Sequence, residues 1–309
     1  SSMAGPGRLL WTYAGPILLI LGIIGNILSI IILLRKSLRR LSWSLYLVTL
    51  AISDILVLCT TTFDYWMRMW KNIHVYTFSA AGCKIENFLT YFSVHFSAWI
   101  LVAVTLERLL FLYWPLRARI LFTRKVAAII IAIIAAALTL VNMHIFWNFQ
   151  LTCRRRRCAC RPLGDGFVWS IIDLCMSTLI PFIIIAICNG FFVKKLLFLR
   201  STTHSTSEAY KQKARATSIM MLSITMTFII LNLPITIVIC LNNTTLKEDP
   251  VLRLALGKAW VFTVFLHQLN SIVNVVLYYL SNSRFQKEVK TILCGNKVSP
   301  VSIVTTDGI

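Results

Sequence analysis

The chain of 309 residues is strongly apolar, with 58% hydrophobic and only 14% charged residues. Because about a quarter of the residues of an ordinary soluble domain are charged, this composition argues against a soluble protein. The net charge of +20 would suggest a nucleic-acid partner only in a soluble protein, so we expect none here.

The apolar residues fall into seven blocks of roughly 22 residues or more, each long enough to cross about 30 Å of hydrocarbon as a helix. They cover residues 9–34, 43–69, 83–113, 125–149, 167–199, 211–240 and 251–281. We therefore predict an all-α membrane protein, a seven-transmembrane helix bundle with a short amphipathic eighth helix. The predicted parts are a tail over 1–8, the seven-helix domain over 9–281, the amphipathic helix over 282–294 and a cytoplasmic tail over 295–309.

The ends and loops predict how the chain sits in the membrane. Residues 1–7 resemble a remnant of cloning, and no cleavable signal peptide is visible, so helix 1 is expected to act as its own insertion signal. Outside the segment 152–161, basic residues concentrate where the cytoplasm would be if the N-terminus were extracellular. The sequons at Asn242 and Asn243 then fall outside, as glycosylation requires. We predict a multi-pass plasma-membrane protein.

Charged side chains inside membrane helices are costly and mark functional sites. Helix 2 carries Asp54 near mid-membrane and Asp64 near its outer end. A carboxylate at mid-membrane needs polar partners or a cation. Helix 3 ends in the adjacent pair Glu107-Arg108. We take this pair as the first functional candidate.

Four cysteines are expected in the oxidising compartment. Cys83 begins helix 3, and Cys153, Cys158 and Cys160 lie in the arginine-rich segment 152–161. Four cysteines allow three pairings. A Cys158–Cys160 bond would be strained at so short a separation, so Cys83 is expected to pair with this segment, through any of its three cysteines.

The last helices carry a kink and many polar groups. In helix 6, Phe228 precedes Pro234, and a proline inside a helix removes a backbone hydrogen bond and makes a pivot. Helix 7 is dense in polar residues for a spanning helix, namely His267, Gln268, Asn270, Ser271, Asn274 and Tyr278.

The segment after helix 7 has the pattern of an amphipathic helix on the inner leaflet, with membrane lipids as its partners. Its apolar residues recur at helical spacing at Phe285, Val289, Ile292 and Leu293. Cys294 closes the segment and is a candidate for palmitoylation, with a free reduced thiol as the alternative.

Enzyme motifs are absent: the sequence contains no His-Glu-x-x-His, no Gly-x-Ser-x-Gly and no glycine-rich phosphate loop. We predict that the protein is not an enzyme. A transporter is the stronger alternative, because Asp54, Glu107 and Arg108 would suit an ion relay. Seven unequal helices without an inverted repeat argue against that class.

The chain resembles a rhodopsin-like (class A) G-protein-coupled receptor over nearly all of residues 9–294. The motifs, in chain order, are Gly25-Asn26, Leu50-Ala51 with Asp54, Cys83, Glu107-Arg108, Pro181, Phe228 with Pro234, and Asn270-Ser271 with Asn274 and Tyr278. The resemblance implies that an extracellular ligand controls a heterotrimeric G protein, with arrestin as a further partner.

The same resemblance assigns roles to several residues. Glu107 and Arg108, with Asn274 and Tyr278, form the switch toward the G protein, and helix 6 swings outward about Phe228 and Pro234. The family's sodium-binding positions correspond here to Asp54, Ser97, Asn270 and Ser271. Oxygen ligands with one carboxylate suit a hard cation, and a water-filled polar network is the alternative. No other cofactor is expected.

Several residues depart from the family pattern. Leu109, Asn189, Asn232 and Val275 replace residues usual in the family. No acid is expected at the inner end of helix 6, where Lys211, Lys213 and Arg215 cluster. An ionic latch between Arg108 and helix 6 is therefore not expected, which predicts measurable signalling without ligand.

The resemblance places the ligand among the outer halves of the helices, at Asp64, Glu86, Thr90, Tyr91, Asp173, Asn232, Val264 and Gln268. Thr90 and Gln268 stand where amine receptors and opsins carry an aspartate and the retinal lysine, which argues against both groups. Three carboxylates favour a cationic ligand, unless they pair with Arg68, Lys84 or Arg253.

The arginine run 154–157 would attract acidic residues, unless it is only a solvated face. Both charged features together suit an extracellular peptide, which we predict as the ligand. The alternatives are a receptor for a small cationic or lipid ligand and, from another class, an ion or proton transporter.

Overall fold

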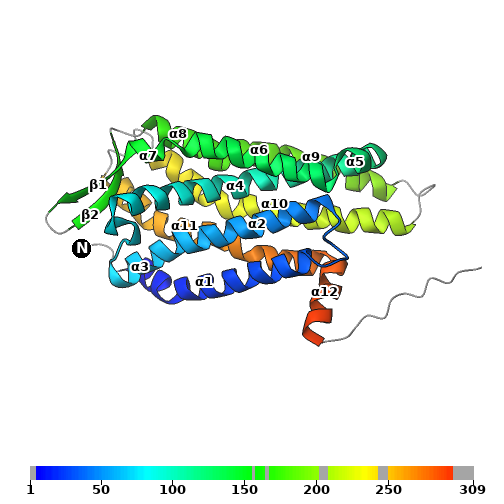
Figure 1. The fold of residues 1–309 in the computed structure, drawn as a ribbon, viewed down its shortest axis with the longest axis horizontal. Helices are drawn as coiled ribbons and strands as arrows, with labels where there is room; N and C mark the ends of the chain where they lie inside the picture. Colours follow the sequence, from blue (N-terminus) through cyan, green and yellow to red (C-terminus); the bar gives the residue numbers. More distant parts are fainter. Residues whose placement is uncertain (1–4, 155–156, 164–166, 202–207, 243–249, 295–309) are drawn as a thin grey trace, which may run out of the picture.

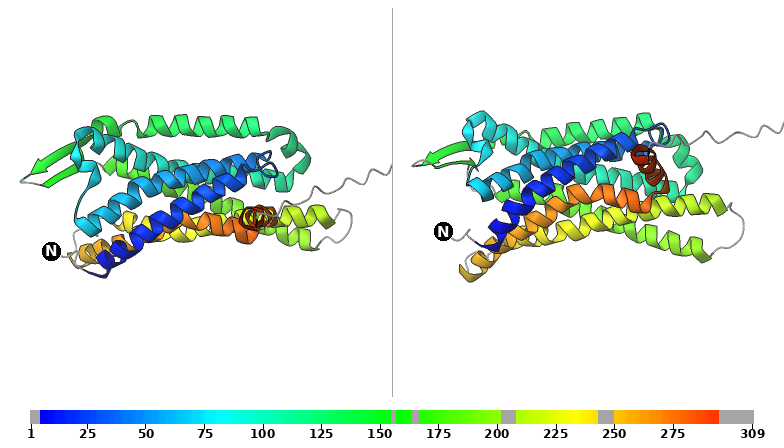
Figure 2. Two further views of the ribbon diagram at one scale, coloured as in Figure 1. Left: turned by 60° about the horizontal axis from the view of Figure 1, so that its bottom comes forward. Right: turned by 90° about the horizontal axis from the view of Figure 1, so that it is seen from below.

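The computed structural model describes residues 5–154, 157–163, 167–201, 208–242 and 250–294. Within these residues, seven helices are long and apolar enough to cross a membrane: Pro6–Leu33, Ser42–Lys71, Ala80–Tyr113, Arg124–Asn148, Val168–Lys195, Ile219–Leu241 and Pro250–Ser281. They run side by side along the long axis of the molecule (Figures 1 and 2). The predicted seven-helix all-α fold is confirmed.

The elements are α1 (Pro6–Leu33), α2 (Ser42–Val57), η1 (Leu58–Thr62), α3 (Phe63–Lys71), η2 (Val75–Phe78), α4 (Ala80–Tyr113), α5 (Pro115–Leu121), α6 (Arg124–Asn142), α7 (Ile145–Asn148), β1 (Phe149–Arg154), β2 (Arg157–Pro162), α8 (Phe167–Leu174), η3 (Cys175–Leu179), α9 (Ile180–Ser201), α10 (Glu208–Asn242), α11 (Pro250–Ser281) and α12 (Ser283–Cys294). The π-helical turns η1 and η3 join α2 to α3 and α8 to α9, so each trio forms one span.

Local chemistry sets several helix boundaries. Ser79 caps α4 by accepting a hydrogen bond from the backbone N–H of Gly82 (2.9 Å). Proline occupies the first turn of α1 and of α5, where its missing N–H costs nothing. Asn72, with φ of 57°, ends α3 in the left-handed conformation that asparagine tolerates.

One end of the bundle carries the antiparallel hairpin β1–β2, and we call it the hairpin end (Figure 1). In the hairpin, Cys153 lies opposite Cys158 and is bonded to it. A second disulfide joins Cys160 of β2 to Cys83 in the first turn of α4. Among the alternatives left open by the sequence, the structure therefore pairs Cys83 with Cys160.

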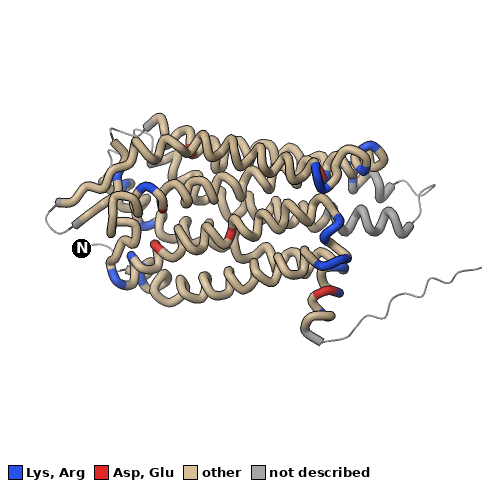
Figure 3. Tube along the Cα trace, viewed as in Figure 1, with Lys and Arg blue, Asp and Glu red and all other residues tan. Residues whose placement is uncertain are grey.

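The opposite end, which we call the α12 end, is crossed by the amphipathic helix α12 (Figure 1). The Phe285 ring is buried against the Tyr278 ring, with centroids 5.7 Å apart. Glu288 forms an ion pair with Arg35 (2.7 Å) and accepts a hydrogen bond from Ser37 (2.5 Å). Lysine and arginine gather at the two ends of the molecule (Figure 3).

Two predicted boundaries need correction. α1 begins at Pro6, so residues 6–8 are helical although the sequence assigned them to the tail; proline is well suited to a first turn. α10 begins at Glu208 rather than at residue 211, so this helix does contain an acid near its start. The structure describes the α10 side chains of residues 219–241, and none of these is an acid.

Two predicted modification sites lie at the limits of the description. Asn242 is the last residue of α10, and Asn243 lies outside the described residues. Cys294 is the last residue of α12, and the predicted cytoplasmic tail, 295–309, also lies outside them. Glycosylation and palmitoylation therefore stay predictions.

Candidate functional site

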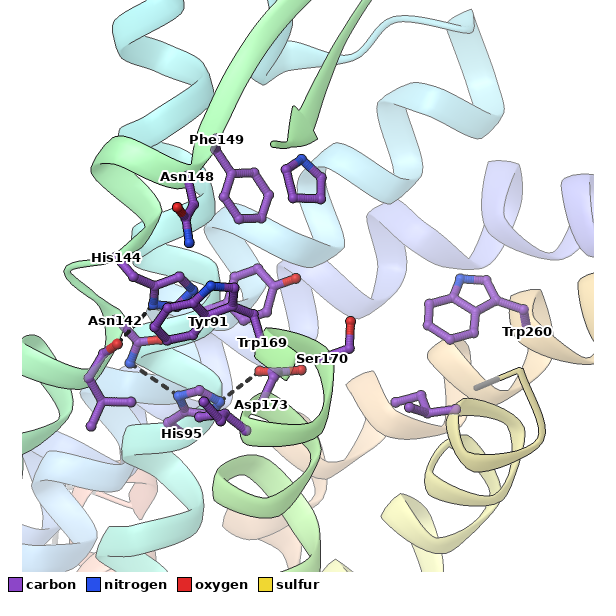
Figure 4. Close-up of a pocket in the computed structure, with 14 residues that line it drawn as sticks. Tyr91, His95, Asn142, His144, Asn148, Phe149, Trp169, Ser170, Asp173 and Trp260 are labelled. Carbon is purple, nitrogen blue, oxygen red and sulfur yellow. Dashed lines mark hydrogen bonds and ion pairs between the residues drawn. The ribbon is translucent and has the colours of Figure 1, made fainter. Parts of the chain in front are cut away.

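A cavity of about 320 Å³ opens at the hairpin end, between α4, the end of α6, β1 and α8. Two of the eight predicted ligand residues, Tyr91 and Asp173, line it (Figure 4). Most of the other polar lining residues were not predicted: His95, Asn142, His144, Asn148, Trp169 and Ser170. We call this the Asp173 cavity.

A chain of hydrogen bonds forms one wall of the Asp173 cavity (Figure 4). His95 Nε2 lies 2.8 Å from Asp173 Oδ1, and its Nδ1 lies 3.1 Å from Asn142 Nδ2. Asn142 and Asp173 thus hold the two ring nitrogens of His95 in place. The Asp173 side chain is 31% exposed, so its carboxyl group can be reached from the cavity.

Aromatic side chains form a large part of the remaining lining of the Asp173 cavity. The His144 ring stacks on Trp169, with centroids 3.7 Å apart and planes within 3° of parallel. The Tyr91 ring meets Phe149 edge to face at 6.2 Å, and Trp260 lies across the cavity (Figure 4). A lining of aromatic rings with one carboxyl group suits a ligand group with an apolar body and a cationic or hydrogen-donating tip.

The other two predicted carboxylates lie outside this cavity, beside η2. Asp64 is buried and accepts a hydrogen bond from the backbone N–H of Val75 (3.1 Å). Glu86 accepts one from Thr90 (3.4 Å). Tyr76 lies near both: burial raises its pKa, the negative charge of Asp64 and then that of Glu86 raise it further, and Arg68 opposes them.

The three predicted ligand residues on α10 and α11 also lie outside the cavity lining. Asn232 is buried, and its Oδ1 lies 2.5 Å from His267 Nδ1. Val264 packs with Trp11 and Met69. Gln268 is fully buried, and among the described residues its amide has no hydrogen-bond partner. The structure therefore does not gather the eight residues into one cavity.

A polar network occupies the middle of the bundle. Asp54 is 0% exposed and accepts hydrogen bonds from Asn274 (2.8 Å) and Ser97 (3.4 Å). Ser97 also donates to Ser53 (2.9 Å). The backbone carbonyl of Ser271 accepts a bond from Asn26 (2.7 Å).

This network fits a hard cation. Among the described residues no basic side chain pairs with Asp54, so its charge has no partner of opposite sign. Ser97 and Ser271 are buried and offer further oxygen ligands. Asn270 makes no described hydrogen bond to Asp54, and Asn274 does so instead.

At the α12 end, Glu107 and Arg108 form a direct ion pair. Ser42 donates to Glu107 Oε1 (2.6 Å), and the Arg108 guanidinium lies 4.2 Å from the centroid of the Phe111 ring. Tyr46 is fully buried, and among the described residues its hydroxyl lacks a hydrogen-bond partner.

The inner half of α10 is mainly apolar on its buried face, where Met220, Met221 and Ile224 are found. Two polar contacts with other segments are described there: Thr225 donates to Asn189 Oδ1 of α9 (2.8 Å), and Asn282 Nδ2 donates to Met220 Sδ (3.4 Å). Asn189 is one of the departures from the family pattern. Here it accepts a hydrogen bond that joins the two helices.

Residues 25–278 match the family described as 7 transmembrane receptor (rhodopsin family). Cysteinyl leukotriene receptor 2 of Homo sapiens is 27% identical, over 88% of this chain and 78% of the receptor. Cysteinyl leukotriene receptor 1 of Homo sapiens is 22% identical, over 88% and 81%. Galanin receptor type 2 of Homo sapiens is 24% identical, over 90% and 71%.

The family match and the seven spans make the protein a multi-pass plasma-membrane protein and a signalling receptor rather than an enzyme. The motifs quoted from the sequence fall on these spans in the expected order. The chain belongs to the rhodopsin family of seven-transmembrane receptors.

Proposed function

We propose that this receptor binds an extracellular peptide at the hairpin end and activates a heterotrimeric G protein at the α12 end. The observation that carries the proposal is the separation of two sites along one bundle. The Asp173 carboxyl group lies in a cavity at the hairpin end, and the buried Glu107–Arg108 pair lies near the other end. The Asp54 network lies between them.

The orientation is argued from the cysteines. Both disulfides, Cys83–Cys160 and Cys153–Cys158, lie at the hairpin end. Disulfides form and persist in oxidising compartments, so the hairpin end is the extracellular one. The N-terminus is then outside, and α12 lies on the cytoplasmic leaflet.

A peptide fits both charged features of the hairpin end. A cationic or hydrogen-donating side chain would enter the Asp173 cavity, and acidic residues would follow the arginine-rich hairpin. Galanin receptor type 2 is among the relatives. The lone carboxylate among aromatic rings would hold the end of such a peptide in one orientation.

The second candidate is a receptor for a small cationic or lipid ligand. A cavity of about 320 Å³ is near the lower limit of the roughly 300–1,000 Å³ typical of small-molecule sites. Two of the relatives are cysteinyl leukotriene receptors. The family assignment argues against the transporter alternative.

In the proposed mechanism, ligand binding shifts the equilibrium toward a state in which α10 has swung outward about Pro234. Arg108 then leaves Glu107 and contacts the G protein. A sodium ion at Asp54, Ser97 and Ser271 would stabilise the resting state by binding it preferentially. Arrestin is proposed as a further partner of the same cytoplasmic face.

The ligand class is tested by screening the expressed receptor against a peptide library and a lipid-mediator library with a readout that covers several G proteins. We expect activation by a peptide with a cationic end. Activation by lipid mediators alone would support the second candidate. Cells expressing Arg108→Ala serve as the control for responses that do not pass through the receptor.

A further inference from the structure

A second cavity lies at the hairpin end, between the first turns of α1 and α11. It measures about 610 Å³, and the two helix ends that border it lie side by side (Figure 2). It shares no lining residue with the Asp173 cavity. We call it the α1–α11 groove.

The lining of the groove that the structure describes is basic. Arg8, Arg253 and Lys258 line it, all three exposed, and no acid does. Among the described residues Arg253 and Lys258 have no ion pair, and Arg8 donates only its Nε hydrogen, to the carbonyl oxygen of Met69 (2.9 Å). Three cations on one surface, with no acid among its described lining residues, attract an anion.

The rest of the lining is apolar, and part of it is exposed on the outer surface of the bundle. Leu254 is 53% exposed and Phe262 is 41% exposed, and both lie within the span Pro250–Ser281. At 1.5 Å per residue, Phe262 lies about 14 Å further along α11 than Arg253. The basic residues thus begin at the edge of the membrane, and apolar surface continues toward its middle. A membrane lipid has the same order, with a charged head followed by hydrocarbon.

The floor of the groove is fixed by α1. The Trp11 indole is fully buried and donates to the backbone carbonyl of Val261 (3.0 Å). Gly7 lies against Val261, where a Cβ would come within 2.8 Å of the valine side chain. The neighbour of Val261 is Trp260, which lines the Asp173 cavity. The groove and the Asp173 cavity are therefore lined by adjacent residues of α11.

We propose that the α1–α11 groove binds a membrane lipid of the outer leaflet that carries an anionic head group. The head-group anion lies between the three basic side chains, and one hydrocarbon chain lies over the apolar ones. The order of the lining favours a lipid over a soluble anion, because one lipid molecule places a charged head and a hydrocarbon chain in this same order along the helix.

The experiment uses the full chain in nanodiscs of phosphatidylcholine that contain a small fraction of photoactivatable lipid. The lipid is either phosphatidylglycerol or phosphatidylcholine with a diazirine in one acyl chain, and labelled peptides are located by mass spectrometry. We expect residues 250–262 to be labelled by phosphatidylglycerol and far less by phosphatidylcholine. Arg253→Gln/Lys258→Gln should reduce this labelling by about tenfold or more, because each basic residue near a membrane surface adds attraction for anionic lipid.

Two variants control for charge and folding. Lys71→Gln/Arg161→Gln removes two exposed basic residues of the same end outside the groove and should leave labelling unchanged. Arg253→Lys/Lys258→Arg keeps the charge and should retain labelling, which separates loss of charge from misfolding. Equal labelling by both lipids, equal loss in the Lys71/Arg161 variant, or full competition by inorganic phosphate at millimolar concentration would overturn the proposal.

Discussion

At the scale of single residues, Asp173 is the central ligand prediction. We expect Asp173→Asn to lower the potency of a cationic peptide by about 10- to 100-fold, because a hydrogen bond to a charged group contributes roughly 1.5–3 kcal/mol. His95→Gln keeps the carboxyl group of Asp173 and changes only the residue that hydrogen-bonds to it, so its effect should be smaller. The half-maximal agonist concentration measures both, with surface expression as the control. Unchanged potency of Asp173→Asn would remove this residue from the ligand site.

Asp54 carries the sodium prediction, also at the residue scale. Replacing choline chloride by sodium chloride at constant ionic strength should lower agonist affinity in the wild-type receptor, because the ion binds the resting state preferentially. Asp54→Asn should lose this dependence, since the asparagine offers no charge to the cation. Competition against a labelled agonist measures the sodium dependence of agonist affinity in both proteins. Equal salt dependence in both proteins would leave a water-filled polar network as the better account.

At the scale of elements, the two disulfides should contribute unequally. Cys83–Cys160 closes a separation of 77 residues and Cys153–Cys158 one of 5. Chain entropy then predicts losses of about 4.5 and about 2 kcal/mol when each bridge is removed. Double alanine variants of each pair, melted in detergent, test the order of the melting temperatures. A larger loss for the hairpin bridge would contradict this entropic account.

The elements differ in how well the sequence predicts them. The seven spans follow from local signals, because each apolar block is itself of membrane length. The Asp173 cavity is harder to predict from the sequence, because His95, Asn142 and Trp169 come from three helices and meet only when the helices pack together. His95 lies four residues after Tyr91 and so on the same face of α4, which is the one signal that would have pointed to it. The partner of Cys83 likewise depends on the register of the hairpin.

At the scale of the whole molecule, the resting state should be held weakly. The described side chains of α10 offer no acid to Arg108, and their buried face there is mainly apolar. We therefore expect the wild-type receptor to signal without ligand, above mock-transfected cells. Glu208→Gln is the matched control, because it removes the one acid of α10 and should not change this basal signal. Basal activity equal to that of mock-transfected cells would count against a weakly held resting state.

The central claim is that the Glu107–Arg108 end of this bundle activates a G protein. The most direct measurement is nucleotide exchange on purified heterotrimeric G proteins added to the receptor in nanodiscs. The wild-type receptor should accelerate exchange over empty nanodiscs, and Arg108→Ala should reduce that acceleration by about 30-fold or more, as expected when a buried charge-pair contact is lost. Exchange equal to that of empty nanodiscs for both proteins, together with ion flux in receptor liposomes that lack G protein, would contradict the account.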